Sequence, residues 1–397
     1  MTLSHICCPP FKFPQSDDVF VFLIFFEVDM SWNPEIAYNE LPLLPPSDFQ
    51  ETAAIFRQTT KSRVALESLR QAVNLIPNNE ILIQTIPILE AQSSSEIENI
   101  VTTTDTLFRY ADLSDNADPA TKEALRYRTA LWAGVNSLKH CPLSLRTMKD
   151  VCSALRDTNV NVRTMPGTYI GSSTTGKVIY TPPNGESVIQ NKLDNLANFL
   201  HTDDELDPLV KMAIAHYQFE AIHPFSDGNG RTGRVVNILY LVEQGLLDQP
   251  VLYLSKYIIE NKQSYYHALL DVTRNNAWEA WILFMLKAIE VTATWTNHKV
   301  KAIADLEHLA IEYMKREKPL ARIYSRELVD TIFQRPYCRV ATLVNADLCQ
   351  RQTAMKYLTI LSDFGILKLL DLGRERLFIN TRLMDLLKNE DHSFESY

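Results

Sequence analysis

The sequence predicts a mainly α-helical chain that carries one small β-hairpin and ends in a separate unit of helices and two short strands. Three observations favour this fold class. Apolar residues recur at three-to-four spacing over most of the chain between about residues 51 and 316, which is typical of helices that bury one face. Four of the eleven glycines fall between residues 164 and 187, around a short β-prone run. Beyond residue 320, helical runs precede two apolar runs that are joined by a turn.

Composition places the chain among globular proteins and excludes several classes. The chain has 397 residues, of which 46% are hydrophobic and 22% charged, so it is long enough for two or three domains. A formal net charge of −9 argues against a nucleic-acid coat and against a membrane-surface protein. The six cysteines form no CxxC pair and no zinc-ligand spacing. We therefore expect buried thiols in a reducing, cytoplasmic compartment.

The first 29 residues differ from the rest of the chain. Residues 19–28 are strongly apolar, but this run is too short to span a bilayer. It also lacks the basic flank and the cleavage site of a signal peptide. Regular patterning begins near Met30. We therefore expect residues 1–29 to be a non-native or disordered extension and Met30 to be the authentic start.

An extended arm and a series of helices are expected next. Four prolines make residues 33–50 extended. A Pro-Asn-Asn break and an Asp-Pro pair, which supplies an N-cap and a first-turn proline, mark helix boundaries. Helices are expected at residues 63–75, 93–110, 119–138 and 142–156, and residues 81–90 are apolar.

A hairpin then interrupts the helices. Residues 177–180 are β-prone and precede Thr-Pro-Pro, so we interpret residues 164–187 as a β-hairpin or flap. The helix that begins at Asp207-Pro208 must end at or before His223, because Pro224 disfavours helical backbone in the residue before it. The next helix is expected over residues 231–244, and further helices reach about residue 316.

Residues 223–234 carry the densest group of reactive side chains, His-Pro-Phe-Ser-Asp-Gly-Asn-Gly-Arg-Thr-Gly-Arg. A glycine-rich loop that leads into a helix presents free N–H groups and the positive end of the helix dipole, which suits a phosphate. His223 can accept a proton near neutral pH, and Asp227 can hold a divalent cation. Arg231 and Arg234 are three residues apart in the first helical turn and so lie on neighbouring faces.

This stretch resembles the signature of the Fic family, His-x-Phe-x-Asp/Glu-Gly-Asn-Gly-Arg-x-x-Arg, at every specified position, and the similarity extends over about residues 30–397. The resemblance implies a Fic-type helical domain and a protein adenylyltransferase, which moves AMP from ATP to a hydroxyl side chain of a target protein, or of itself, with Mg²⁺. It makes His223 the general base, Phe225 the apolar anchor of the loop and Asp227 the metal ligand. The nucleotide-binding residues are then Gly228, Asn229, Gly230, Arg231, Thr232, Gly233 and Arg234. Main-chain N–H groups of residues 228–230, with the Asn229 side chain, would form the anion hole.

A second motif resembles the inhibitory motif of the family, Ser/Thr-x-x-x-Glu-Gly/Asn, at residues 94–99. If Glu98 pairs with Arg234, that arginine cannot receive the γ-phosphate of ATP, and the enzyme is autoinhibited. Ser95 and Glu98 also have the spacing of a capping box at a helix start, which is the alternative interpretation. In some relatives the inhibitory glutamate helps to remove AMP, so de-AMPylation is a second activity to consider.

The C-terminal part suggests a different class of function. Helical runs at 325–334, 339–346 and 351–364, followed by strands at 366–370 and 377–380, form a winged-helix pattern. This pattern raises the alternative of a DNA-binding regulator that uses the Fic domain as a nucleotide sensor. Residues 320–397 contain eleven Lys or Arg against ten Asp or Glu, a balance of +1, so a homodimer or target-docking module is favoured over a DNA-binding one. A relative that transfers another phosphate-containing group is a further alternative.

The family pattern divides the chain into the arm and inhibitory helices at 30–110, a Fic core at 111–316 and a winged-helix domain at 317–397. Tyr265 and Tyr266 lie where relatives place an aromatic side chain against adenine, although core packing would equally explain them. The flap at residues 177–183 is expected to accept a target loop along a free strand edge. An ordinary hairpin is the alternative.

Overall fold

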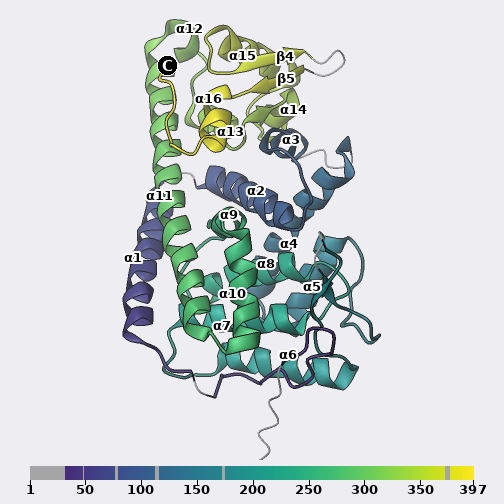
Figure 1. Cartoon of the computed structure of the whole chain (residues 1–397). Helices are drawn as coiled ribbons and strands as arrows, with labels where there is room; N and C mark the ends of the chain where they lie inside the picture. The colour runs from purple at the N-terminus through teal and green to yellow at the C-terminus, as the bar shows by residue number, and fades with distance from the viewer. Residues whose placement is uncertain (1–31, 48, 77–78, 112–115, 172–174, 372–375) are drawn as a thin grey trace, which may run out of the picture. The chain divides into compact units, whose positions relative to one another are not determined.

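Helices form most of the chain, as the apolar spacing predicts (Figure 1). The computed structural model describes residues 32–47, 49–76, 79–111, 116–171, 175–371 and 376–397. The extension expected over residues 1–29 lies outside these residues. The helices before the C-terminal domain are α1 (Ala53–Leu75), α2 (Glu80–Ile97), α3 (Thr104–Tyr110), α4 (Pro119–Leu138), α5 (Leu145–Arg156), α6 (Glu186–His201), α7 (Pro208–Ile222), α8 (Asn229–Glu243), α9 (Leu254–Glu260), α10 (Lys262–Asn275) and α11 (Trp278–Arg316).

Two Asp-Pro pairs start helices as predicted. The Asp118 side chain accepts a hydrogen bond from the Thr121 N–H, and Pro119 occupies the first position of α4, where no intrahelical donor is needed. Asp207 caps α7 in the same way through the Leu209 N–H. Helix α7 ends at Ile222, directly before the motif, as the following proline predicts.

The prediction of a single helix over residues 93–110 was wrong. Helix α2 continues through Ser93–Ser95 to Ile97, and α3 is a separate helix. The capping-box interpretation fails for the same reason, because Ser95 lies near the C-terminal end of a helix. Serine hydroxyls favour helix starts when they bind nearby main chain. Here the Ser93 hydroxyl instead bonds the Tyr253 hydroxyl at 2.7 Å, and Ser94 binds Arg234, so other elements satisfy these side chains.

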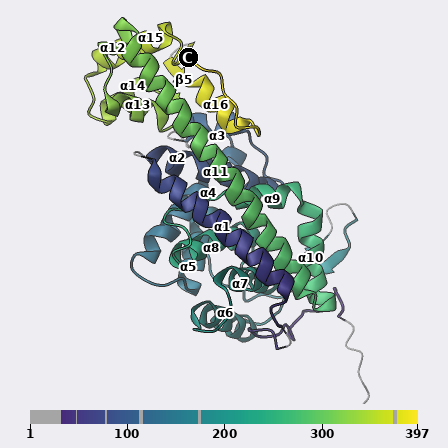
Figure 2. The same cartoon turned by 90° about the vertical axis from the view of Figure 1, so that its left-hand side faces the viewer.

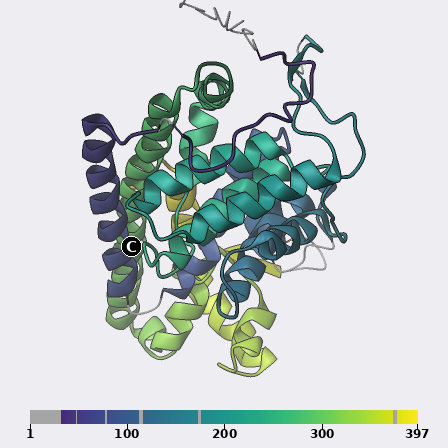
Figure 3. The same cartoon turned by 90° about the horizontal axis from the view of Figure 1, so that it is seen from below.

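The hairpin and the extended arm are both present and are bonded to each other. Strand β1 (Ile170–Gly171) pairs antiparallel with β2 (Val178–Tyr180). The arm crosses the teal helices as the purple trace in Figure 3. It reaches the end of the flap through a hydrogen bond from the Tyr38 N–H to the Thr181 carbonyl at 2.9 Å. Asn195 of α6 fixes the arm further along, where its amide bonds both main-chain groups of Leu44.

The C-terminal domain has the predicted winged-helix elements. The predicted helices are α13 (Arg326–Phe333), α14 (Val340–Asn345) and α15 (Arg351–Asp363), and the predicted strands are β4 (Lys368–Asp371) and β5 (Arg376–Ile379). The turn between the strands falls largely on residues 372–375, outside the described residues. The prediction missed α12 (Lys318–Ala321), β3 (Tyr337–Cys338) and α16 (Thr381–Lys388). Strand β3 pairs antiparallel with β5, which gives the sheet order β3-β5-β4.

The C-terminal domain contacts the helices that carry the inhibitory motif. Residues Asn33–Tyr397 form one unit, in which the long helix α11 packs along α1 (Figure 2) and continues to the C-terminal domain. Arg335 donates to Gln84 of α2 at 3.0 Å, and the Tyr337 hydroxyl donates to Asp105 of α3 at 3.0 Å. The winged-helix domain therefore holds α2 and α3 on the side away from the motif loop.

Two composition-based expectations can be compared with the described residues. No described helix is both long and apolar enough to cross a membrane. The described cysteines are free thiols, of which Cys152 and Cys338 are buried, whereas Cys141 and Cys349 are only half-buried. Burial of every thiol was therefore an overestimate.

Candidate active site

His223 lies at the carboxyl end of α7 and directly precedes the glycine-rich loop. Its backbone is left-handed, with φ 48° and ψ 59°, which is uncommon for a residue with a side chain. The imidazole is half-buried, and its Nδ1 has no hydrogen-bond partner among the described residues. Burial, followed by the nearby Arg163 cation, lowers the pKa of His223 to about 4. The imidazole is therefore neutral at physiological pH and ready to accept a proton.

Phe225 and Asn229 fix the shape of the loop. Phe225 is completely buried, as expected of the apolar anchor. The Asn229 side chain accepts from the Phe225 N–H at 2.8 Å and donates to the Phe225 carbonyl at 2.8 Å. Because both ends of this amide are engaged, the Asn229 side chain braces the loop. Because Nδ2 carries two protons, the expected part of the Asn229 side chain in an anion hole stays a prediction, as does that of the main-chain N–H groups.

Asp227 and Gly228 lie at the turn into α8. Gly228 has φ 81°, a conformation that requires glycine, and it is the N-cap of α8. One Asp227 oxygen accepts from the Gly228 N–H at 2.6 Å, and the other pairs with Arg156 of α5. The Asp227 side chain is 53% exposed. The described residues hold no group of three or more metal-ligating side chains. Asp227 is thus a single accessible carboxylate with a cation beside it.

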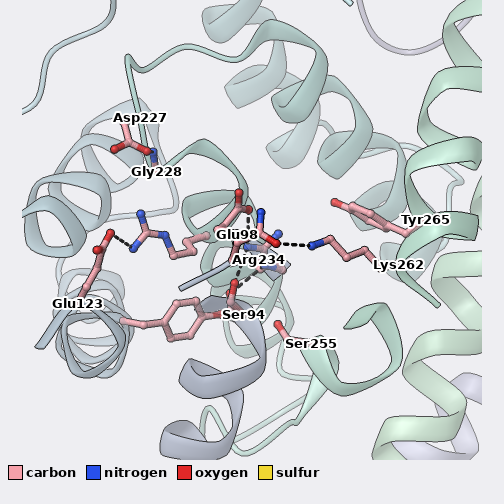
Figure 4. Close-up of polar contacts among 12 residues, drawn as sticks. Ser94, Glu98, Glu123, Asp227, Gly228, Arg234, Ser255, Lys262 and Tyr265 are labelled. Carbon is pink, nitrogen blue, oxygen red and sulfur yellow. Dashed lines mark hydrogen bonds and ion pairs between the residues drawn. The ribbon is translucent and has the colours of Figure 1, made fainter. Parts of the chain in front are cut away.

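The Glu98 carboxylate lies against the first turn of α8 (Figure 4). A Cβ atom added to Gly230 would lie 2.2 Å from Glu98 Oε1 and 3.1 Å from Arg234 Nη1. The first turn of a helix has N–H groups without intrahelical partners and carries the positive end of the dipole. A carboxylate therefore lies at the end of α8 that favours a negative charge.

Arg234 is almost completely enclosed, with 1% of its side chain exposed, and α2 supplies its partners. Its Nη2 donates to Glu98 Oε1 at 2.8 Å and to the Ser94 carbonyl at 2.9 Å, and its Nε donates to the Ser94 hydroxyl at 2.8 Å. Burial alone would raise the pKa of Glu98, but the Arg234 cation outweighs it and holds that pKa below its ordinary value. The predicted contact between Glu98 and Arg234 is therefore present, with both groups charged.

The local backbone explains why Glu98 reaches the loop. Glu98 is the C-cap of α2, and Asn99 follows it in the left-handed conformation with φ 63°. The Asn99 N–H bonds the Glu96 carbonyl at 2.9 Å, and the Ile100 N–H bonds the Ser95 carbonyl at 3.0 Å. This pattern is a Schellman motif, which ends a helix most easily at Gly or Asn. The Gly/Asn position of the inhibitory motif is thus the residue that stops α2 directly after the glutamate.

Arg231 has a different acidic partner. Its Nη1 donates to Glu123 Oε1 of α4 at 2.8 Å, and its side chain is 2% exposed. Thr232 is fully buried behind it. Gly233 stays a predicted nucleotide-binding residue, but a Cβ there would meet Glu220 Oε1 at 2.7 Å and Phe219 at 3.1 Å. Gly233 therefore faces α7 and allows the two motif helices to pack closely.

The prediction that Tyr265 faces adenine is also corrected. Tyr265 is 1% exposed, its hydroxyl bonds His216 Nε2 at 2.8 Å, and its ring packs against Trp281. It is a core residue and offers no face to an adenine. Its neighbour Tyr266 is 44% exposed. Two adjacent helical positions point in different directions, so sequence placement alone cannot choose between them.

Four further residues belong to the site although the sequence did not single them out: Arg156, Glu123, Arg163 and Glu220. Arg163 donates to the His223 carbonyl from 60 residues away, and Arg231 meets Glu123 across 108 residues. Glu220 lies one turn before His223, and burial raises its pKa to about 7. Its Oε1 has no hydrogen-bond partner among the described residues. Only Glu220, a carboxyl within an apolar helical run, carried a signal that could have been noticed.

Three family models match the chain in succession. The Fic/DOC family N-terminal model matches residues 56–136, and the Fic/DOC family model matches residues 142–241. The C-terminal domain model of protein adenylyltransferase SoFic-like proteins matches residues 306–383.

Individual relatives match over shorter stretches. The probable protein adenylyltransferase aq_aa38 of Aquifex aeolicus is 36% identical over 95 residues, which are 24% of this chain and 29% of the relative. The protein adenylyltransferase fic-1 of Caenorhabditis elegans is 35% identical over 92 residues, 23% of this chain and 17% of the relative. The chain thus spans less than a third of the length of either relative.

A solved structure supports the fold. A Fic family protein from Desulfovibrio desulfuricans G20 superimposes with a TM-score of 0.50 at 19% identity, and the match covers 83% of this chain and 97% of the other. The likeness supports the fold, and the three consecutive matches show that the chain combines Fic/DOC family N-terminal and Fic domains with a SoFic-like C-terminal domain.

Proposed function

We propose that this chain is a protein adenylyltransferase, which transfers AMP from ATP to a hydroxyl side chain of target proteins and of itself, and that Glu98 restrains it. The observation that carries the proposal is the Glu98 carboxylate at the first turn of α8, bonded to Arg234. A site that holds a protein carboxylate between a helix N-terminus and a buried arginine is suited to the phosphates of a nucleotide.

In the transfer, the target hydroxyl loses its proton, and a new bond to the α-phosphorus replaces the bond to the leaving group. The target hydroxyl oxygen attacks the α-phosphorus, and its proton passes to the neutral imidazole of His223. The bond between the α-phosphorus and the oxygen that bridges to the β-phosphate breaks, and pyrophosphate leaves. Main-chain N–H groups at the start of α8 would stabilise the charge that develops on the α-phosphate oxygens. Arg231 and Arg234 would bind the leaving phosphates.

A magnesium ion fits the donor set near the loop. Mg²⁺ usually takes one or two carboxylates and completes its shell with phosphates and water, so the accessible carboxylate of Asp227 suffices. Arg156 would have to share or release that carboxylate. When bound, the ion would neutralise phosphate charge and favour departure of pyrophosphate.

Glu98 would act by competition. While it holds Arg234, that arginine cannot bind the terminal phosphate, and the carboxylate repels the same group. ATP then binds with its α-phosphate misaligned for attack. In de-AMPylation, the same carboxylate would help to remove AMP from a modified hydroxyl.

The flap and the C-terminal domain would serve protein contacts. A target segment could add to the exposed flap beside β1 and β2 and bring its hydroxyl to His223. We assign the winged-helix domain to target docking or homodimer formation, because Arg335 and Arg339 already bind α2 and α3 and its charge is nearly balanced. The free thiols support a reducing, cytoplasmic setting.

Intact-mass spectrometry tests the proposal. The Glu98→Gly variant, incubated with ATP and Mg²⁺, is expected to gain the mass of AMP, and the Glu98→Gly/His223→Ala variant is expected to gain none. A gain equal to a phosphate would favour a relative that transfers another group. No gain on the chain itself or on proteins of a cell extract would contradict adenylyl transfer.

A further inference from the structure

Four consecutive carbonyls at the end of α7 are bound by the segment that carries the flap. The last carbonyls of a helix have no intrahelical partners and must be satisfied elsewhere. The Tyr180 hydroxyl of β2 donates to the Ala221 carbonyl at 2.9 Å. Arg163 Nη2 donates to the Ile222 carbonyl at 3.1 Å and Nε to the His223 carbonyl at 2.8 Å, while the Arg163 N–H donates to the Pro224 carbonyl at 2.9 Å.

The same guanidinium also reaches the far end of the flap. Arg163 Nη2 donates to the Pro183 carbonyl at 2.6 Å. One side chain therefore joins the backbone of His223 to the residues just after β2. A planar guanidinium presents its donors as a rigid fork, so these contacts fix orientation as well as distance. The single ammonium group of a lysine cannot reproduce them.

Burial of the Arg163 guanidinium has a high free-energy cost, which a structural contact alone would not explain. Arg163 is 8% exposed, and its guanidinium donates to main-chain carbonyls, with no ion pair among the described residues. A buried cation without a carboxylate partner is costly and is retained where its donors are needed. Its position also places a positive charge near the His223 imidazole, which favours the neutral form.

We propose that Arg163 is a positioning residue, which holds the flap and His223 in one register so that a hydroxyl docked on the flap lies within reach of the base. Arg163 acts through the main chain of residues 222–224 and does not touch the substrate. The left-handed backbone of His223 is kept in place by these contacts. This inference rests on the proposed transfer reaction.

The test uses the full chain carrying Glu98→Gly, so that transfer is measurable, with Arg163→Ala and Arg163→Lys added separately. Arg128→Ala is the control, because Arg128 of α4 is a half-buried arginine that also donates to a main-chain carbonyl, that of Ala111 at 3.0 Å. We expect Arg163→Ala to lower the transfer rate about 10-fold to 100-fold, because displacements near 1 Å have effects of that size. The affinity for ATP should stay within about twofold, and millimolar guanidinium should restore part of the rate.

Two readouts are independent of transfer. In Arg163→Ala the NMR-measured pKa of His223 should rise, because a neighbouring cation has been removed while Glu98, where present, and Asp227 still favour the charged imidazole. Amide exchange in residues 175–181 should accelerate. Arg163→Lys should keep the His223 pKa near its starting value yet fail to restore the rate. A full transfer rate in Arg163→Lys would overturn the positioning role, and unchanged flap exchange in Arg163→Ala would overturn it even if AMP transfer itself were absent.

Discussion

Arg231 and Arg234 lie in the same turn of α8, yet their surroundings differ. Both side chains are enclosed, at 2% and 1% exposed, and both pair with a glutamate at 2.8 Å that is about one-third exposed. Glu123 approaches Arg231 from α4, whereas Glu98 lies against Gly230 at the start of the helix. We therefore propose that an ion pair with one of these arginines does not by itself restrain the enzyme. The position of the carboxylate, inside the space meant for an anion, distinguishes Glu98 from Glu123.

The largest effect is expected at Glu98. Removing one partner of a buried ion pair leaves the other charge unpaired, at a cost of roughly 3–5 kcal/mol. Because about 1.4 kcal/mol corresponds to tenfold in rate, Glu98→Gly should accelerate AMP transfer about 100-fold or more. Glu98→Gln keeps the volume and loses the charge, so its rate should lie between the two. Initial rates with labelled ATP measure all three, and equal rates for Glu98→Gln and the unmodified chain would show that volume, not charge, blocks the site.

An NMR titration tests whether the His223 imidazole is already neutral in the restrained chain. An ordinary histidine with pKa about 6.5 would lose about tenfold in neutral base by pH 5.5. The pKa of His223 is lowered to about 4, so the neutral form persists as pH falls and is lost only near that value. NMR titration of the free chain should therefore show an imidazole still neutral at pH 5.5. A midpoint above 6 would assign the restraint to His223 as well as to Arg234.

Asn99 sharpens the comparison by moving Glu98 without removing it. The left-handed backbone at this position costs a β-branched residue about 1–2 kcal/mol. Asn99→Val should therefore shift the end of α2 and raise the transfer rate about fivefold. Asn99→Gly tolerates the same backbone and is the matched control, with the brake intact. Equal transfer rates in the two variants would show that the end of α2 does not control inhibition.

Glu123 should give the smallest effect and the opposite sign. The Arg231–Glu123 pair is enclosed to the same degree as the Arg234–Glu98 pair, but Glu123 approaches its arginine from α4. Glu123→Gln should slow transfer by Glu98→Gly less than about fivefold, because Arg231 loses only an orienting partner. Steady-state rates across ATP concentrations measure this effect. A large acceleration would mean that Glu123 is a second brake and would break the distinction between the two arginines.

The sequence predicted the parts of the site that are local in the chain. The spacing within residues 223–234 indicated the base, the loop and both arginines, because one turn brings them together. The Asp-Pro helix starts were also predictable, since a cap acts over three residues. Long-range contacts were not, as Glu123 and Arg163 come from other elements and neither lies in a motif.

The failures have the same origin. Three consecutive serines looked like a helix start, but Tyr253 and Arg234 take up the first two hydroxyls inside α2. Tyr265 was indistinguishable from Tyr266 until packing against His216 and Trp281 showed which of the two faces the core. In each case a partner distant in the chain outweighed a local preference.

Calorimetric binding of ATP and ADP tests the central claim, that Glu98 and the terminal phosphate compete for Arg234. Both nucleotides would be titrated into the His223→Ala chain with and without Glu98→Gly, so that no turnover intervenes. We expect the preference for ATP over ADP to be small while Glu98 is present and to rise about tenfold or more, ~1.4 kcal/mol, when Glu98 is removed. The same preference in both chains would contradict competition at Arg234.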